Sequence, residues 1–139
     1  MSAHFRRWMV ELGAECGHED VTDTVREVVN ESGITTGLVA VGMAGSTGAV
    51  TTIEYESGAL KDLWRAVEQL APADDEYAHN LKWGDGNGFS HVRSALLKTS
   101  LSIPVIDGEL YLGTWQQIAV FNFDNRSRRR EVSAVVVGE

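Results

Sequence analysis

The sequence predicts an α+β domain in which antiparallel β-sheet dominates. Two observations lead to this prediction. Two segments of the first half have the apolar spacing of amphipathic helices, and the last third alternates apolar strands with turn residues. The chain has 139 residues, of which 43% are hydrophobic and 23% are charged. This length and composition fit one domain, residues 1–139, built on a single core.

The chain begins with a predicted strand and a predicted helix. Apolar and polar residues alternate over residues 5–12, which indicates a strand with one face toward the core. The helix that follows has apolar residues at the i, i+4, i+7 and i+8 positions of one face: Val21, Val25, Val28 and Val29. Asp20 or Thr22 can cap this helix, and Gly33 is placed to end it.

Two more strands and a second helix complete the first half. We expect strands over residues 37–43 and 49–55, separated by the small polar turn Gly45-Ser46-Thr47-Gly48. The second helix covers residues 57–70, with Ser57 as its N-cap. Its apolar face consists of Leu60, Leu63, Trp64, Val67 and Leu70. Pro72 then prevents the helix from continuing.

The second half combines a long polar loop, a short helix and four strands. Residues 72–88 are polar and irregular, and a loop of that length in a small domain is often functional. A third helix is expected near residues 89–98, with Phe89, Val92, Leu96 and Leu97 facing inward. Strands are expected over residues 100–106, 109–112, 114–123 and 131–137. Asp107-Gly108 is a strong hairpin signal between the first two of these.

The charge and the cysteine content exclude several functions. The net charge of −8 is unsuited to binding nucleic acid, which needs a basic surface, and to binding an anionic membrane. The single cysteine, Cys16, cannot form an internal disulfide. No apolar segment resembles a signal peptide or a membrane span. We therefore expect a cytoplasmic protein without nucleic-acid or membrane partners.

The densest group of polar residues lies in the long loop and at the start of the third helix. It contains Tyr77, His79, Asp85, Asn87 and His91. Two histidines and a carboxylate are typical of a metal site or an acid–base pair, although their spacing matches no closed zinc pattern. The alternative is a tight Asp-Gly-Asn-Gly turn with histidines at the surface. We expect His79, Asp85, Asn87 and His91 to converge with Glu54 on one pocket.

Four further features each allow a functional and a structural interpretation. Ser46 and Thr47 could bind phosphate through hydroxyl and backbone N–H groups, or belong to a simple turn. The run Thr114-Trp115-Gln116 could line a pocket, or place the tryptophan in the core. Glu54, in an apolar strand, lies at a strand end or is buried with a partner. The basic cluster of residues 126–130 is a solvated turn, or a phosphate site if the hydroxyl loop lies nearby.

Several motifs of the chain together resemble those of the YjbQ-like family. In chain order they are Tyr77-x-His79, Gly84-Asp85-Gly86-Asn87-Gly88-x-x-His91-Val92-Arg93-Ser94-x-Leu96, Ile103-Pro104-Val105, Gly108-x-Leu110-x-Leu112-Gly113-Thr114-Trp115-Gln116-Gln117-Ile118 and Phe123-Asp124. The likeness extends from the first strand to Gly138. One departure stands out, because Gly45 occupies the place where many members of that family carry a histidine.

The resemblance implies a fold, an assembly and an activity. The fold is a distorted, jelly-roll-like antiparallel sandwich with two or three flanking helices, and the assembly is a cytoplasmic homotrimer. The activity is a weak thiamine-phosphate synthase reaction, which joins a pyrimidine diphosphate to a thiazole phosphate and releases pyrophosphate. By position, the polar cluster of the family corresponds to His79, Asp85, Asn87 and His91, its acidic residue to Glu54, and its pocket strand to Thr114, Trp115 and Gln116.

Three hypotheses follow from the resemblance. In the first, the chain is an enzyme for a phosphorylated heterocycle. Its catalytic residues are Glu54, His79, Asp85 and His91. Phosphate is held by residues 45–48, including Ser46 and Thr47, and by Arg93. Trp115 stacks on the ring of the substrate. A divalent ion is expected, Mg²⁺ held by Asp85 and Glu54 for turnover, or Zn²⁺ or Mn²⁺ at His79, Asp85 and His91. In the second, a trimer binds a metal or a phosphometabolite without turnover. In the third, the cluster only stabilises subunit contacts.

Overall fold

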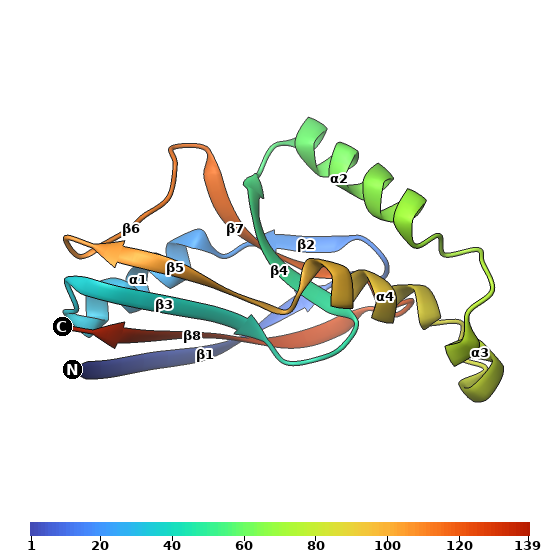
Figure 1. The fold of residues 1–139 in the computed structure, drawn as a ribbon, viewed down its shortest axis with the longest axis horizontal. Helices are drawn as coiled ribbons and strands as arrows, with labels where there is room; N and C mark the ends of the chain where they lie inside the picture. Colours follow the sequence, from blue (N-terminus) through green and yellow to red (C-terminus); the bar gives the residue numbers. More distant parts are fainter.

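The computed structural model describes residues 1–139, which form two antiparallel sheets and four helices (Figure 1). The larger sheet has the strand order β1 (Ser2–Leu12), β8 (Arg128–Gly138), β3 (Thr36–Met43), β5 (Ser100–Ile106) and β6 (Glu109–Leu110). The smaller sheet has the order β2 (Gly17–Asp20), β7 (Gln116–Asn122) and β4 (Gly48–Glu54). The helices are α1 (Thr22–Ser32), α2 (Ser57–Leu70), α3 (Ala78–Trp83) and α4 (Gly88–Leu97). The expected β-rich α+β fold is confirmed.

The main core lies between the inner faces of the larger sheet, the smaller sheet and α1. Alternate residues of β8, namely Val132, Ala134 and Val136, are fully buried, as the two-residue period of a strand requires. The predicted face of α1 supplies Val25 and Val28, which are also fully buried. A second, smaller core lies between α2 and the smaller sheet and contains few buried residues: Ala49, Val67, Ala119, Phe121 and Phe123.

The ends of the helices show which capping predictions were right. Gly33 ends α1 in the left-handed conformation, with φ of 67°, as predicted. The N-cap of α1 is Val21, so the prediction of Asp20 or Thr22 was wrong, although Asp20 Oδ1 accepts hydrogen bonds from the backbone N–H and the hydroxyl of Thr22, at 2.9 and 2.6 Å. The N-cap of α2 is Glu56, and the prediction of Ser57 was wrong by one residue. The Glu56 carboxylate reaches two backbone N–H groups, and a serine side chain at position 57 is already within the helix.

The region predicted as a long loop is the main departure from the sequence analysis. It contains α3, a short helix that raises the number of helices to four. Trp83 does not anchor this segment to the core, because 66% of its side chain is exposed. On α4, Phe89 is buried as expected, whereas Val92 and Leu96 face outward. The inner face of α4 instead buries three polar side chains, those of Ser90, Arg93 and Ser94. Each of them forms a hydrogen bond with another part of the chain, which makes its burial possible.

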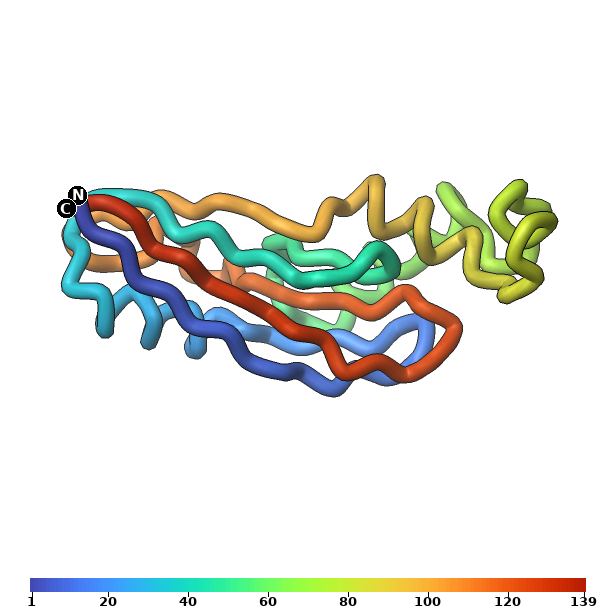
Figure 2. Tube along the Cα trace, turned by 90° about the horizontal axis from the view of Figure 1, so that it is seen from below, coloured from blue at the N-terminus to red at the C-terminus, as the bar shows by residue number.

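The termini and α3 mark the two ends of an elongated molecule. Figure 2 shows the first and last residues side by side at one end and α3 and α4 at the other. The termini lie together because β1 pairs with β8, which places Ser2 opposite Gly138. None of the four helices has the length and apolar character needed to cross a membrane.

Candidate functional site

His79, Asp85 and His91 lie together where α3 meets α4. His79 Nε2 lies 3.1 Å from Asp85 Oδ2, and the rings of His79 and His91 are 4.5 Å apart between centroids. The hydrogen bond from His79 is the main reason why the pKa of Asp85 is lowered. The carboxylate is therefore charged at neutral pH. The structure thus brings together three of the four residues predicted as catalytic.

Local hydrogen bonds and one glycine hold this arrangement in place. Asp85 Oδ1 accepts the backbone N–H of Asn87 at 3.1 Å, and Asn80 Oδ1 accepts that of Gly88 at 2.9 Å. A Cβ at Gly88 would lie 2.4 Å from the Cβ of Tyr77, so only glycine allows α3 and α4 to approach so closely. The predicted turn chemistry and the predicted site therefore coexist in the same residues.

A buried polar network supports the cluster from below. Asp124, 2% exposed, accepts hydrogen bonds at Oδ2 from the Thr47 hydroxyl at 3.0 Å and the Asn87 amide at 3.1 Å. The guanidinium of Arg128 lies 3.1 Å from the same oxygen. Burial alone would raise the pKa of Asp124, but the hydrogen bonds to its charged form outweigh burial and the pKa is lowered. Asn87 and Thr47 thus serve this network and are buried away from the surface.

Arg130 is the second buried charge of the network. Its Nη2 donates to Thr47 Oγ1 at 2.5 Å and to Asn122 Oδ1 at 2.7 Å, while its buried Nε has no partner. Its Nη1 lies 2.7 Å from the position that a Cβ would take at Gly45. Burial lowers the pKa of Arg130, and the nearby Asp124 acts in the opposite direction. The hydroxyl loop and the basic cluster therefore do meet, at Arg130.

A polar pocket of about 370 Å³ opens beside these groups. Its lining consists of Gly45, Ser46, His91, Ser94, Ala95, Lys98 and Thr99. The pocket contains a lysine, a histidine and three hydroxyls but no carboxylate, in a protein whose net charge is −8. Its chemistry therefore suits an anion. We call this space the polar pocket.

Several predicted site residues lie elsewhere. Glu54 is the last residue of β4 and lies opposite Gln116. The other end of β4 is the one that contacts α4, because the Ser94 hydroxyl donates a hydrogen bond to the carbonyl of Gly48. Six residues of strand separate Glu54 from Gly48 by roughly 20 Å. The prediction that Glu54 converges with the histidines was therefore wrong. The sequence placed it correctly at a strand end, but the direction of β4 carries that end away from α4.

The run Thr114-Trp115-Gln116 lies with Glu54 at the far end of the smaller sheet. Gln116 Nε2 donates to Thr52 Oγ1 at 3.2 Å, and Gln116 Oε1 accepts the backbone N–H of Gly113 at 3.0 Å. The side chain of Trp115 is 72% exposed and belongs neither to the core nor to the polar pocket. These residues form a turn that the glutamine holds closed.

Arg93 points away from the polar pocket as well. It is 1% exposed, donates to the carbonyl of Ala71 at 2.9 Å and pairs with Glu68 at 2.5 Å. Its guanidinium lies over the rings of Trp64 and Phe89, at 5.2 and 4.8 Å from their centroids. Arg93 therefore joins α4 to α2, and it is not a ligand for a group in the pocket.

Three residues of the site were not predicted from the sequence, namely Asp124, Lys98 and Thr99. The specific role of Arg130 was not predicted either. A signal existed for Asp124, because Asn122 and Asp124 come directly after a strongly apolar strand, where buried polar groups need partners. No group of three or more His, Cys, Asp or Glu side chains is arranged to hold a metal ion.

Comparisons with known proteins agree with each other. Residues 6–139 match the family described as UPF0047 protein YjbQ-like. A UPF0047 protein of Methanothermobacter thermautotrophicus is 41% identical over 115 residues, which cover 82% of this chain and 79% of that protein. A UPF0047 protein of Archaeoglobus fulgidus is 36% identical over 113 residues, covering 81% and 86% of the two chains. A YbjQ-like protein of unknown function from Sulfolobus solfataricus has a solved structure with a TM-score of 0.93, 28% identity and 99% of each chain covered.

Proposed function

The chain belongs to the UPF0047 family of YjbQ-like proteins, and we propose that its polar pocket binds a phosphorylated small molecule and acts on it by acid–base chemistry. The names of these relatives state no activity, and the Sulfolobus solfataricus protein is described as one of unknown function, so the proposal depends on the geometry of this chain. The observation that carries it is the position of Arg130. A buried guanidinium directs its Nη1 toward Gly45, at the wall of a pocket without any carboxylate.

The anion-binding half of the proposal rests on complementary charge. Lys98 and Ser46 line the pocket and are exposed, so both are free to contact a phosphate. Gly45 adopts φ of +137° and leaves room for Arg130 behind the loop, which a side chain at this position would fill. A guanidinium in a partly buried site is a strong phosphate ligand because it is less well hydrated than an ammonium group.

The acid–base half rests on the two imidazoles. His91 lies at the pocket wall, and its ring is 4.5 Å from that of His79, which lies within hydrogen-bond distance of Asp85. An imidazole in this position can donate its N–H to a bound phosphate or give a proton to a departing one.

The reaction that we propose is the one that the family resemblance implies. The ring nitrogen of a thiazole phosphate attacks the methylene carbon of a pyrimidine diphosphate, a C–N bond forms, and the C–O bond to pyrophosphate breaks with its electron pair. Lys98 and Ser46 hold the departing pyrophosphate, and the positive charge of Arg130 behind Gly45 adds to the stabilisation of its developing charge. A divalent ion at His79, Asp85 and His91 stays a prediction that assays with Mg²⁺, Mn²⁺ and Zn²⁺ will test.

The experiment measures binding and turnover separately. Calorimetry with pyrophosphate is expected to show binding by the wild-type protein and at least tenfold weaker binding by Lys98→Ala. Lys82→Ala, with the same loss of charge on α3, is the control and is expected to bind normally. Chromatography of thiamine phosphate then measures turnover, which Asp85→Asn should reduce without weakening pyrophosphate binding. Binding without turnover by the wild-type protein would favour the non-catalytic alternative, and no binding would refute both.

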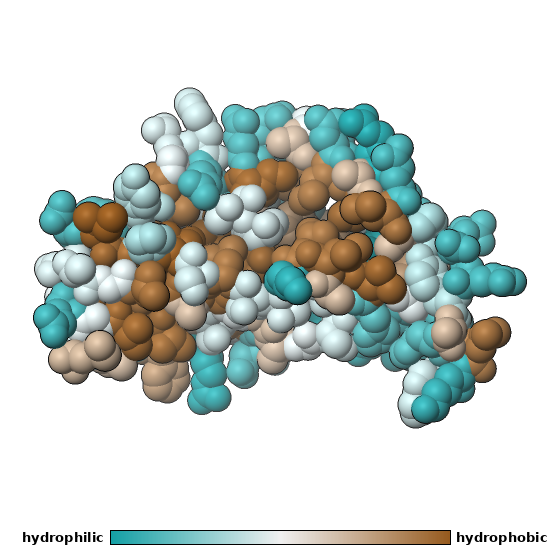
Figure 3. Space-filling model, viewed as in Figure 1, coloured by the Kyte–Doolittle hydropathy of each residue, from teal (hydrophilic) through white to brown (hydrophobic).

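We also propose that the protein forms a homotrimer through the outer face of its larger sheet. Six large apolar side chains are exposed there in adjacent rows: Phe5, Met9, Leu38, Ile106, Val135 and Val137. Figure 3 looks toward the β5 edge of this sheet and shows apolar surface there and beside α4. Exposed patches of this kind typically mark protein interfaces. Light scattering should give three times the 15.2 kDa chain mass, and Val135→Asp should lower it. A monomer at micromolar concentration would refute the proposal.

The cytoplasmic location stays a proposal. An exposed, unpaired Cys16 is compatible with a reducing compartment.

A further inference from the structure

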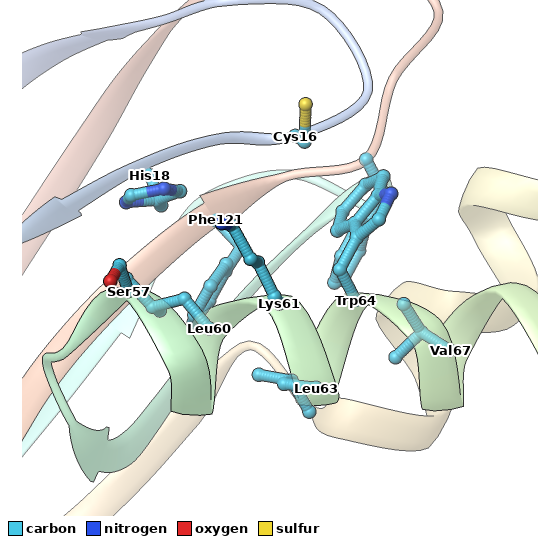
Figure 4. A pocket seen from close by; sticks show the side chains of 10 residues that line it. Cys16, His18, Ser57, Leu60, Lys61, Leu63, Trp64, Val67 and Phe121 are labelled. Carbon is cyan, nitrogen blue, oxygen red and sulfur yellow. The ribbon is translucent and has the colours of Figure 1, made fainter.

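A second cavity lies on the opposite side of the smaller sheet from the main core, beneath α2 (Figure 4). Its volume is about 390 Å³, and seven of its ten lining residues are hydrophobic. Leu60, Leu63 and Trp64 point from α2 toward the sheet yet are only half-buried. Protein interiors are normally close-packed, so an apolar space of this size within a small core is large enough to receive a ligand. We call this space the apolar cavity.

The walls of the apolar cavity suit a flat ring. Phe121 on β7 and Phe123, directly after that strand, are stacked with an interplanar angle of 9° and a centroid distance of 6.2 Å. The ring of Trp64 approaches Phe123 from α2, at 6.0 Å. Aromatic side chains bind planar ligands by offset or edge-to-face contact. Volumes between 300 and 1,000 Å³, roughly, are typical of small-molecule sites.

The polar groups at the mouth of the cavity suit a negative charge. Lys61 points into the cavity from α2 and forms no ion pair within 4.0 Å, in a protein with a net charge of −8 (Figure 4). Glu56, a carboxylate on which the charge of Lys61 acts, accepts hydrogen bonds from two backbone N–H groups at the start of α2. The amine is therefore available to a ligand.

His18 provides a second donor beside Lys61. Its Nδ1 lies 2.6 Å from the hydroxyl of Tyr55. Burial raises the pKa of Tyr55, so the hydroxyl keeps its proton at neutral pH and can donate it to Nδ1. An imidazole that accepts this hydrogen bond at Nδ1 carries a proton at Nε2, which can donate to an anion. His18 also contacts Phe121, with centroids 6.0 Å apart, and is thereby fixed at the edge of the ring site.

We propose that the apolar cavity is a binding site for an aromatic carboxylic acid. The ring packs against Phe121, Phe123 and Trp64. The carboxylate is held by Lys61 and by His18 Nε2. This site is separate from the polar pocket, and it does not depend on the function proposed above.

The experiment uses 2-naphthoate and its uncharged analogue 2-naphthalenemethanol as probes, with calorimetry on the full-length protein. Wild-type protein is expected to bind 2-naphthoate at least tenfold more tightly than the alcohol. Lys61→Met should remove this preference while leaving the affinity for the alcohol unchanged. Because Cys16 is the single cysteine and lines the cavity, saturating 2-naphthoate should also slow its alkylation by iodoacetamide.

Two leucines of α2 provide matched variants for the location of the site. Leu63→Trp fills the cavity and should weaken 2-naphthoate binding at least tenfold, with folding verified by circular dichroism. Leu70→Trp, at a position that is 68% exposed and outside the cavity, should bind as the wild type does. His91→Ala should also bind normally, which separates this proposal from the function of the polar pocket. Absence of binding at millimolar concentration, or equal weakening by Leu63→Trp and Leu70→Trp, would overturn the proposal.

Discussion

The polar pocket and the apolar cavity have nearly the same volume, about 370 and 390 Å³, but opposite construction. The polar pocket has one hydrophobic lining residue of seven and lies on a network of buried charges that satisfy one another within the chain. The apolar cavity exists because α2 stands away from the sheet over Phe121 and Phe123. A site built on buried charges is fixed before a ligand arrives, whereas a site built on an incomplete core gains packing when it is filled.

The largest effect expected is on the buried network. Asp124→Ala removes the charge that offsets Arg130 and leaves Thr47 and Asn87 without an acceptor. Because an uncompensated buried charge is costly, we expect a loss of about 3–4 kcal/mol in the free energy of unfolding. Urea denaturation measures it, with the exposed Asp74→Ala as control. A loss below about 1 kcal/mol would mean that the network is not what fixes this site.

A smaller loss of stability is expected in the second core. Leu63→Ala truncates a half-buried side chain that already faces open space, so little new cavity is created. We expect a loss near 1 kcal/mol, well below the roughly 2–5 kcal/mol typical of a leucine in a close-packed core. The same urea titration gives the value. A loss of several kcal/mol would show that α2 closes onto the sheet in solution.

The buried network of the polar pocket should make the stability of the protein depend on pH in the acid range. Because the pKa of Asp124 is lowered in the folded protein, its carboxylate contributes stability at pH values above the unfolded pKa. That contribution is lost as the pH falls through the folded value, below about pH 4. Unfolding free energies measured between pH 6 and pH 3 should fall less steeply for Asp124→Asn than for the wild type. Identical slopes would show that Asp124 does not govern this dependence.

The smallest effect on stability is expected at the surface of the polar pocket. His91→Ala should change the unfolding free energy by less than about 0.5 kcal/mol, since the side chain is half-buried and forms no hydrogen bond within the chain. Pyrophosphate affinity should fall at least tenfold. Thermal melting and calorimetry on the same sample test both parts. A large drop in melting temperature would indicate a structural role for the histidine pair.

Local patterns in the sequence were enough to predict most of the elements. The strand alternation, the valine stripe of α1, the end of α1 at Gly33 and the Asp107-Gly108 turn all depend on neighbours within a few residues. Both turn residues adopt positive φ, 53° and 78°, as a tight hairpin requires. The helix α3 was missed because six residues give too short a period to recognise. Glu56 was missed as a cap because serine is usually the stronger signal.

The candidate site divides along the same line. His79, Asp85 and His91 are close in sequence, and a turn of known chemistry brings them together, so the sequence by itself determined that cluster. Only the tertiary structure showed that three further residues lie at this site, namely Asp124, Arg130 and Lys98. It also showed that three predicted residues lie elsewhere, namely Glu54, Trp115 and Arg93. The physical reason is that strand pairing sets which ends of β4, β7 and β8 meet, and burial then requires partners for charges that are distant in the chain. The spacing of residues predicts neither the direction in which a strand runs in the sheet nor which groups become the partners of a buried charge.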